Sequence, residues 1–322
     1  MTGLSVVAFF TAATFGGAYA TTLMSESFSA STTAPNSWLA VGNACLTAST
    51  PQTRATSIPA CHAALDAPGQ GALQLTAGTS SQIAMIVSHR ALATNEKLQI
   101  TFTDASYSGS TPGADGITLF LSDASKPLPT AVGSAGGSLG YASTTKTPGI
   151  ENGYLGVAFD EYGSFSSATE GRNGGPGQIP ETIAIRGAAS AGYPYLGGTK
   201  NSAGQAVSLP FDFDQPSRAQ RPPNAPTIQV VLSKGQLSVA IDRHDGNGFS
   251  TYFSQSVVNV NGQPAVPAHV YIGFTGSTGG LFNRHEILNF AVSAGPGSAG
   301  STFTPTQSKS ASEVRPSRGR RL

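Results

Sequence analysis

The chain has 322 residues, which is long enough for one large domain with terminal extensions. Charged residues make up only 11% of it and the formal net charge is +1, so its charge gives no reason to expect nucleic acid as a partner. The 39 glycines and 21 prolines supply many turn positions, and with so few charges they favour short strands over helices.

The first twenty residues have the pattern of a secretory signal peptide. An apolar run from Leu4 to Phe15 precedes Ala18-Tyr19-Ala20, a small-x-small cleavage sequence. The usual basic residue before the run is missing, and a buried first strand is the alternative interpretation. The run is too short and too often interrupted by glycine to span a membrane. We therefore expect residues 1–20 to be a signal peptide and the mature protein to be secreted or held at the cell surface.

The chain has two cysteines, Cys45 and Cys61. A structural zinc site needs about four ligands and a redox motif needs the Cys-x-x-Cys spacing, so neither fits. In an exported chain we expect the two cysteines to form one disulfide that closes a short loop. Two free buried thiols are the alternative.

After residue 20, alternating apolar and polar residues predict strands rather than helices. Runs of period two separated by Gly, Pro, Asn and Asp indicate an antiparallel sandwich. The sequences Asp245-Gly246-Asn247-Gly248 and Asn261-Gly262 are typical of hairpin turns. The apolar positions predicted to share one face of their strands are Leu98, Ile100, Phe102, Ile117, Leu119, Leu121, Val230, Leu232, Leu237, Val239, Ile241, Val270, Ile272 and Phe274.

Two further segments depart from the strand pattern. Residues 187–226 are rich in Gly, Pro, Ser and Asn, and we predict a long surface insertion near the binding rim. From residue 295 on, Ser, Thr, Gly and Pro dominate and the end is rich in arginine, which predicts a disordered basic tail. The predicted organisation is a signal peptide (1–20), a β-sandwich (21–294) and the tail (295–322).

Four segments, in this order, resemble the sugar-binding region of the legume-type (L-type) lectins. They are Ala114–Leu121, Gly136–Gly140, Gly156–Tyr162, and Tyr271–Gly279 running into His285–Phe290. The resemblance is to bacterial members of the family, which occur as modules of secreted or surface proteins. It implies an all-β fold, a concanavalin-like (legume lectin-type) antiparallel β-sandwich or jelly roll.

The resemblance also implies a sugar site. A carboxylate accepts hydrogen bonds from neighbouring hydroxyls and a bare glycine N–H donates one back, and these parts match Asp115 and Gly137. The ring of Tyr162 can cover the apolar face of the sugar, and Ser164 stands where the family has an asparagine. For Asp115 alone, a turn-capping role is the alternative, since Asp is common before Gly in turns. The implied sugar contacts are Asp115, Gly137, Tyr162, Ser164, Phe282 and Asn283.

The family binds calcium and a transition metal beside the sugar, and this chain keeps only part of the ligand set. Asp160 matches the central aspartate, whereas Ala158, Ser164 and Thr182 replace a Glu, an Asn and a His. Calcium needs six to eight oxygens, and Asp160, the Tyr162 carbonyl and Ser164 supply only some. We therefore expect at most one calcium ion there and no transition-metal ion. A strand end bound by backbone N–H groups is the alternative role of Asp160.

The predicted function is non-catalytic carbohydrate binding outside the cell, with a glycan as partner and adhesion as a context. One alternative is a glycan-degrading enzyme, which needs two carboxyl groups flanking a bond, whereas the adjacent Asp160 and Glu161 point to opposite faces of a strand. Gly136–Gly140 matches a nucleophile-elbow string, but no helix pattern follows it. Another alternative is a structural surface module whose sugar site has decayed. Nothing in the sequence sets the oligomeric state.

Overall fold

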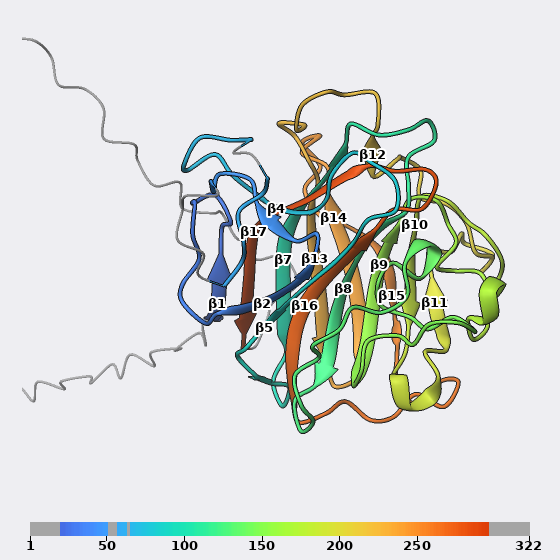
Figure 1. Ribbon diagram of the computed structural model, residues 1–322. Helices are drawn as coiled ribbons and strands as arrows, with labels where there is room; N and C mark the ends of the chain where they lie inside the picture. Colours follow the sequence, from blue (N-terminus) through green and yellow to red (C-terminus); the bar gives the residue numbers. More distant parts are fainter. Residues whose placement is uncertain (1–19, 51–56, 63–64, 296–322) are drawn as a thin grey trace, which may run out of the picture.

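The computed structural model describes residues 20–50, 57–62 and 65–295. In these residues the strands β1 to β17 form two facing sheets, and the helical elements are three short 3-10 turns (Figure 1). The turns are η1 (Gly136–Ser138), η2 (Thr169–Gly171) and η3 (Ala189–Ala191). The predicted all-β sandwich is confirmed. The cleavage sequence up to residue 19 and the tail from residue 296 lie outside the described residues.

The first sheet has nine strands in the order β15-β14-β13-β7-β17-β4-β3, with β1 also paired to β17 and β12 paired in parallel to β7. Its strands are β1 (Thr21–Glu26), β3 (Cys45–Leu46), β4 (Leu73–Thr76), β7 (Leu98–Tyr107), β12 (Asp214–Gln215), β13 (Thr227–Ser233), β14 (Gln236–Asp242), β15 (Ser250–Ser256) and β17 (Arg284–Ala294).

The second sheet has eight strands in the order β11-β10-β9-β8-β16-β5-β2, with β6 also paired to β16. Its strands are β2 (Trp38–Gly42), β5 (Ile83–Ser88), β6 (Leu92–Ala93), β8 (Gly116–Asp123), β9 (Gly153–Asp160), β10 (Thr182–Arg186), β11 (Tyr195–Gly198) and β16 (His269–Ser277).

The second sheet is buried on both faces. One face meets the first sheet, and every apolar position predicted to share a strand face lies in the core between them. Because side chains alternate along a strand, Phe120 points the other way and joins a second cluster with Leu139, Tyr141 and Phe165. These three residues lie on the long loops after β8 and β9, so the loops cover the outer face of the sheet.

The segment 187–226 differs from the predicted surface insertion. It contains β11 and β12, and it buries Leu209 and Phe213 in the core between the sheets. The ring of Phe213 meets that of Phe159 edge-on, with centroids 5.5 Å apart. The insertion prediction was therefore wrong for these parts, which pair with both sheets and contribute to the core.

The predicted disulfide is confirmed, since Cys45 of β3 is bonded to Cys61. Across the described residues, no helix combines the length and the apolar character that a membrane crossing requires.

Candidate functional site

The register of three neighbouring strands brings the lectin-like segments to one end of the second sheet. Gly116, the first residue of β8, pairs with Asp160 at the end of β9 and with Ser277 at the end of β16. The loop before β8, the loop after β9 and the loop after β16 therefore meet there. We call this place the rim site and define it by Asp115, Gly137, Ser164 and Gly279.

Backbone hydrogen bonds fix Asp115 at the centre of the rim site. Its N–H donates to the carbonyl of Ser277 at 3.2 Å, and its carbonyl accepts the N–H of Glu161 at 3.1 Å. The peptide bond that joins it to Ala114 is cis. Its side chain is nearly buried, with the residue 6% exposed, and Oδ2 has no hydrogen-bond partner among the described residues. A turn-capping carboxylate would accept a local N–H, and this oxygen accepts none.

Two glycines lie at the rim site, each next to a polar side chain. A Cβ built on Gly279 would lie 3.4 Å from Asp115 Oδ2, so the bare backbone of Gly279 runs alongside this oxygen. A Cβ on Gly137 would lie only 2.2 Å from the Cβ of Ser164, closer than real contacts allow. The Ser277 hydroxyl donates to the carbonyl of Gly136 at 2.8 Å, which ties η1 to the strand end beside Asp115.

Tyr162 and Ser164 lie on the loop between β9 and β10 (residues 161–181), called the β9–β10 loop below. Both residues are half-buried. The N–H of Tyr162 donates to the carbonyl of Asp115 at 3.4 Å, and its own carbonyl accepts Nε2 of Gln178 at 3.0 Å. The structure thus brings Asp115, Gly137, Tyr162 and Ser164 to one end of the sheet.

Phe282 and Asn283 follow β16 and differ in their surroundings. Phe282 is half-buried, and its N–H donates to Oγ of Ser110 at 2.9 Å. Asn283 is fully buried, and its Nδ2 donates to Glu161 Oε2 at 2.7 Å and to Asp214 Oδ2 at 2.6 Å. Because the residue is fully buried and its amide nitrogen has two acceptors inside the protein, Asn283 is left out of the sugar contacts proposed below.

A buried polar cluster beneath the rim site was not foreseen from the sequence. Nε2 of His285 lies 3.1 Å from Oε1 of Glu161, and both side chains are excluded from solvent. Burial alone would raise the pKa of Glu161, but His285 and the hydrogen bonds hold it below its usual value. Burial opposes the charged form of His285, and Glu161 raises the pKa of His285 above its usual value. The adjacent pairs Asp160-Glu161 and His285-Glu286 were the signal available in the sequence.

Asp160 holds the β9–β10 loop by its carboxyl group. Oδ1 accepts the N–H of Gly163 at 2.9 Å, and Oδ2 accepts those of Phe165 and Ser166 at 2.8 and 3.3 Å. Burial raises the pKa of Asp160 to about 8, and these three N–H donors oppose the rise. The described residues contain no group of three or more His, Cys, Asp or Glu side chains arranged to hold a metal ion. The geometry matches the alternative role of Asp160, a strand end bound by backbone N–H groups.

The electrostatic surroundings of Asp115 oppose its ionisation. Burial is the main cause that raises the pKa of Asp115 to about 6. The nearby carboxylates of Glu161 and Glu170 raise it further, whereas His285 and Arg172 lower it. The carboxyl group is therefore mostly ionised at neutral pH and becomes protonated in mild acid.

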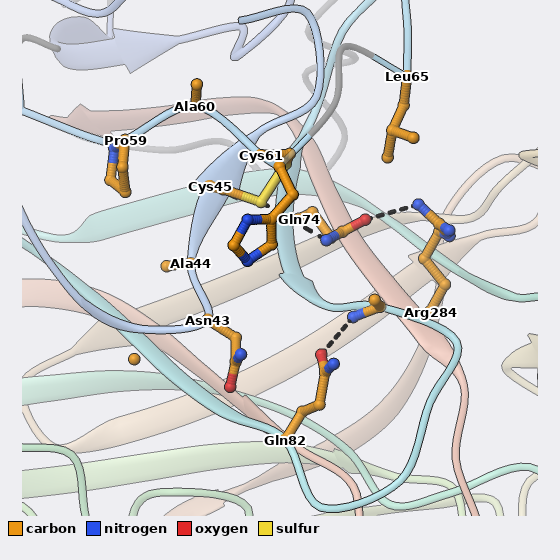
Figure 2. A pocket seen from close by; sticks show the side chains of 13 residues that line it. Asn43, Ala44, Cys45, Pro59, Ala60, Cys61, Leu65, Gln74, Gln82 and Arg284 are labelled. Atoms are coloured by element: carbon orange, nitrogen blue, oxygen red, sulfur yellow. Dashed lines mark hydrogen bonds between the residues drawn. A yellow bond between two sulfur atoms is a disulfide. The ribbon is translucent and has the colours of Figure 1, made fainter. Parts of the chain in front are cut away.

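A separate hollow of about 460 Å³ lies beside the disulfide (Figure 2). Its lining includes Asn43, Leu65, Gln82 and Arg284. Leu65 is an exposed large apolar residue, and Nη1 of Arg284 donates to Gln74 at 2.6 Å. No residue implied as a sugar contact lines this hollow, so we treat it as distinct from the rim site.

Comparisons with known proteins give a match at the level of structure. No protein-family model matches the sequence, and no curated protein matches it. Lectin II from Ulex europaeus (UEA-II), solved with galactose, aligns with a TM-score of 0.52 at 15% identity over 85% of this chain and 99% of that chain. The chain has the fold of the L-type lectins. The predicted fold class, a concanavalin-like β-sandwich, is therefore confirmed.

Two other solved lectins give the same result. Peanut lectin with a nine-residue peptide aligns with a TM-score of 0.51 at 17% identity, over 84% of this chain and 97% of that chain. The exoplasmic/lumenal domain of VIP36, bound to calcium and Man3GlcNAc, aligns with a TM-score of 0.51 at 15% identity, over 84% of this chain and 89% of that chain.

Proposed function

We propose that this chain is a non-catalytic carbohydrate-binding module that acts outside the cell. The observation that carries the proposal is the unpartnered Oδ2 of Asp115, nearly buried beside Gly279 where three loops meet. Leaving a buried acceptor unsatisfied costs about 1–3 kcal/mol, which a hydroxyl donor from a ligand would recover. Neighbouring hydroxyls are the donors that a sugar ring offers.

The other residues of the rim site suit the same ligand class. The N–H of Gly137 can donate to a sugar oxygen, Ser164 adds a hydroxyl, and the ring of Tyr162 can cover an apolar sugar face. Phe282 on the loop after β16 would add a second aromatic contact. The solved structures of the same fold with galactose and with Man3GlcNAc support a glycan as the ligand class.

Hydrolysis of glycans is the weaker alternative. It needs two carboxyl groups about 5–9.5 Å apart on either side of a bond. Asp160 and Glu161 are both buried and have separate partners, backbone N–H groups for one and His285 for the other. In the elbow-like string, Ser138 is buried and its Oγ accepts Nη1 of Arg172 at 3.1 Å. These groups are engaged in holding the fold.

The disulfide and the start of the first strand support the proposed location. The disulfide between Cys45 and Cys61 is typical of an oxidising compartment, and β1 starts at Thr21, directly after the predicted cleavage sequence. We propose that residues 1–20 are removed and that the module works in a secreted or surface protein, with adhesion as its context and a bacterial source.

A glycan array tests the proposal. The wild-type protein should bind a defined set of glycans, and Asp115→Asn should weaken that binding at least tenfold, because charge-assisted hydrogen bonds are worth about 1.5–3 kcal/mol each. Asp123→Asn, at the opposite end of β8, is the matched control and should bind like wild type. If the wild type binds no glycan, the proposed function is contradicted. If Asp115→Asn binds as well as wild type, the proposed role of Asp115 is contradicted. Release of reducing sugar would favour the hydrolase.

A further inference from the structure

A buried arginine lies under the β9–β10 loop, and within the described part of the chain its hydrogen bonds all go to backbone oxygens. Arg186 ends β10, is 0% exposed, and points to the outer face of its sheet with Ala184. A guanidinium has five N–H donors, and the five hydrogen bonds of Arg186 match that number. The accepting carbonyls, at 2.8 to 3.0 Å, belong to Phe165, Ser167, Asn173, Gly174 and Tyr193.

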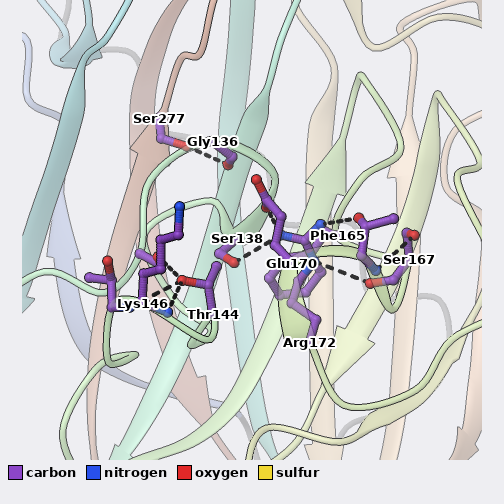
Figure 3. A network of polar contacts seen from close by, with 12 residues as sticks. Gly136, Ser138, Thr144, Lys146, Phe165, Ser167, Glu170, Arg172 and Ser277 are labelled. Carbon is purple, nitrogen blue, oxygen red and sulfur yellow. Dashed lines mark hydrogen bonds and ion pairs between the residues drawn. The ribbon is translucent and has the colours of Figure 1, made fainter.

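A second arginine joins this loop to the glycine turn of the rim site. Arg172, whose side chain is 1% exposed, donates from Nε to the carbonyl of Ser167 at 3.1 Å. Its Nη1 donates to Ser138 Oγ at 3.1 Å and to Glu170 Oε2 at 2.7 Å. Figure 3 shows Arg172 between Ser138 of η1 and Ser167 of the β9–β10 loop. This contact links the turn that carries Gly137 to the β9–β10 loop.

The calcium that the fold implies does not fit this loop. Both carboxylate oxygens of Asp160 accept N–H groups, and the carbonyl of Tyr162 accepts Gln178. Backbone carbonyls of this loop could also bind a cation, but four of them accept hydrogen bonds from Arg186. A calcium ion needs six to eight oxygens, and the oxygens of Asp160 and the carbonyl of Tyr162 already have hydrogen-bond donors.

The guanidinium is a suitable substitute for an ion. Its planar fork fixes several acceptors at once, whereas a lysine ammonium would offer three donors at one point. The rings of Phe165 and Tyr195 lie 5.4 and 6.0 Å from its central carbon and add cation–π attraction. Burial and the neighbouring Arg172 lower the pKa of Arg186 to about 10, so the group stays charged at neutral pH.

We propose that Arg186, assisted by Arg172, is the internal cation that orders the β9–β10 loop, so that this chain holds its ligand-binding loops without calcium. Arg186 and Arg172 are positioning residues, because they act through the loop that carries Tyr162 and Ser164 and through the turn that carries Gly137. The inference rests on the proposed function only for its effect on glycan binding. The order of the loop can be measured without any glycan.

The first experiment adds calcium chloride or excess chelator to the full chain. The expected result is the same melting temperature and the same glycan-array signal in both conditions. A ligand that binds only the folded state raises the melting temperature by mass action, so a calcium-dependent shift would overturn the proposal. If the wild type binds no glycan in either condition, the proposed function fails, while the melting curves still test the internal cation.

The second experiment follows amide hydrogen exchange in two variants. Arg186→Lys keeps the charge and loses the fork, and Arg186→Met removes both. The expected result is faster exchange in residues 163–175, unchanged exchange in β7 and β13, and array binding weakened at least tenfold. Wild-type exchange and binding in Arg186→Met would overturn the proposal. If that variant does not fold, Arg186→Lys and Arg172→Met give the same readouts, with Arg218→Met, at an exposed site, as the control.

Discussion

At the scale of single residues, Asp115 has a position fixed by its backbone and a side chain that is left without a full set of partners. Three backbone hydrogen bonds, with Ser277, Glu161 and Tyr162, hold it, whereas Oδ2 has no partner among the described residues. Its pKa is raised to about 6, chiefly by burial. Glu161 and Glu170 add to this rise, and His285 and Arg172 oppose it. The charge of the proposed ligand-binding group therefore changes in mild acid.

Glycan affinity should consequently fall as the pH drops through about 6. The protonated carboxyl group loses its charge and one acceptor, so hydroxyl donors bind it less well. Stability should change in the opposite sense, because a carboxyl pKa raised from 3.8 to about 6 stabilises the folded state fully below 3.8, and this contribution is lost as the pH rises through about 6. Calorimetric titration with a glycan found on the array, between about pH 5 and about pH 8, measures the effect.

Asp115→Asn is the control for this titration. Its residual binding should show no midpoint near pH 6, since asparagine does not titrate. A wild-type affinity that stays constant over the same range would show that the ionisation of Asp115 plays no part in binding.

The residues of the rim site and those packed around it divide into residues that a sequence pattern can predict and residues that it cannot. Asp115 and Gly137 lie in the short motifs Ala114–Leu121 and Gly136–Gly140, whose residue types by themselves suggest hydrogen bonds to sugar hydroxyls. The burial of Asn283 and the pairing of Glu161 with His285 depend on which loops cover them, and no periodicity carries that information. Arg186 gave one signal, a charged residue at the end of an apolar strand in a chain that is only 11% charged.

At the scale of elements, the register of β8, β9 and β16 brings the loops of the site together. The alternation of Ile117, Leu119 and Leu121 correctly predicted the inner face of β8. The segment 187–226 was misread because β11 and β12 have only four and two residues, too few for a period to show. Its core contacts come instead from single side chains such as Phe213, between prolines and glycines that suggest a loop.

Arg221 connects this segment to both the sheet and the loop before β4. Its Nε donates to Glu286 Oε2 at 2.6 Å, and its Nη2 to Asp66 Oδ2 at 2.7 Å. The side chain of Glu286 is 1% exposed, so Arg221→Met removes a positive charge that pairs with a buried carboxylate. Arg284 and Tyr107 still contact Glu286, so we expect the free energy of unfolding to fall by up to about 3–5 kcal/mol in urea denaturation.

Two further variants check the cause of that loss. Arg218→Met removes an exposed arginine from the same segment and should change stability by no more than about 0.5 kcal/mol. Adding Glu286→Gln to Arg221→Met should recover part of the loss, because the unpaired buried charge is then removed. Equal stability of Arg221→Met and wild type would show that the ion pair contributes nothing.

At the scale of the whole molecule, the rim site and the disulfide belong to different parts of the sandwich. The rim site uses loops at the ends of β8, β9 and β16, whereas the disulfide joins β3 to a residue 16 positions later. Loops also cover the outer face of the second sheet, so the chain buries one apolar cluster on each side of that sheet. Stability and ligand binding should therefore be separable by mutation.

The double variant Cys45→Ala/Cys61→Ala makes this separation measurable. Removing a crosslink over 16 residues should lower the free energy of unfolding by about 3 kcal/mol, because the unfolded chain regains the freedom that the closed loop denies it. Its glycan-array pattern should stay that of wild type, since neither cysteine supports the loops around Asp115. Urea denaturation of the variant, of wild type and of wild type with a reducing agent measures the first effect. Lost array binding in a variant that is still folded under the assay conditions would mean that the disulfide shapes the site itself.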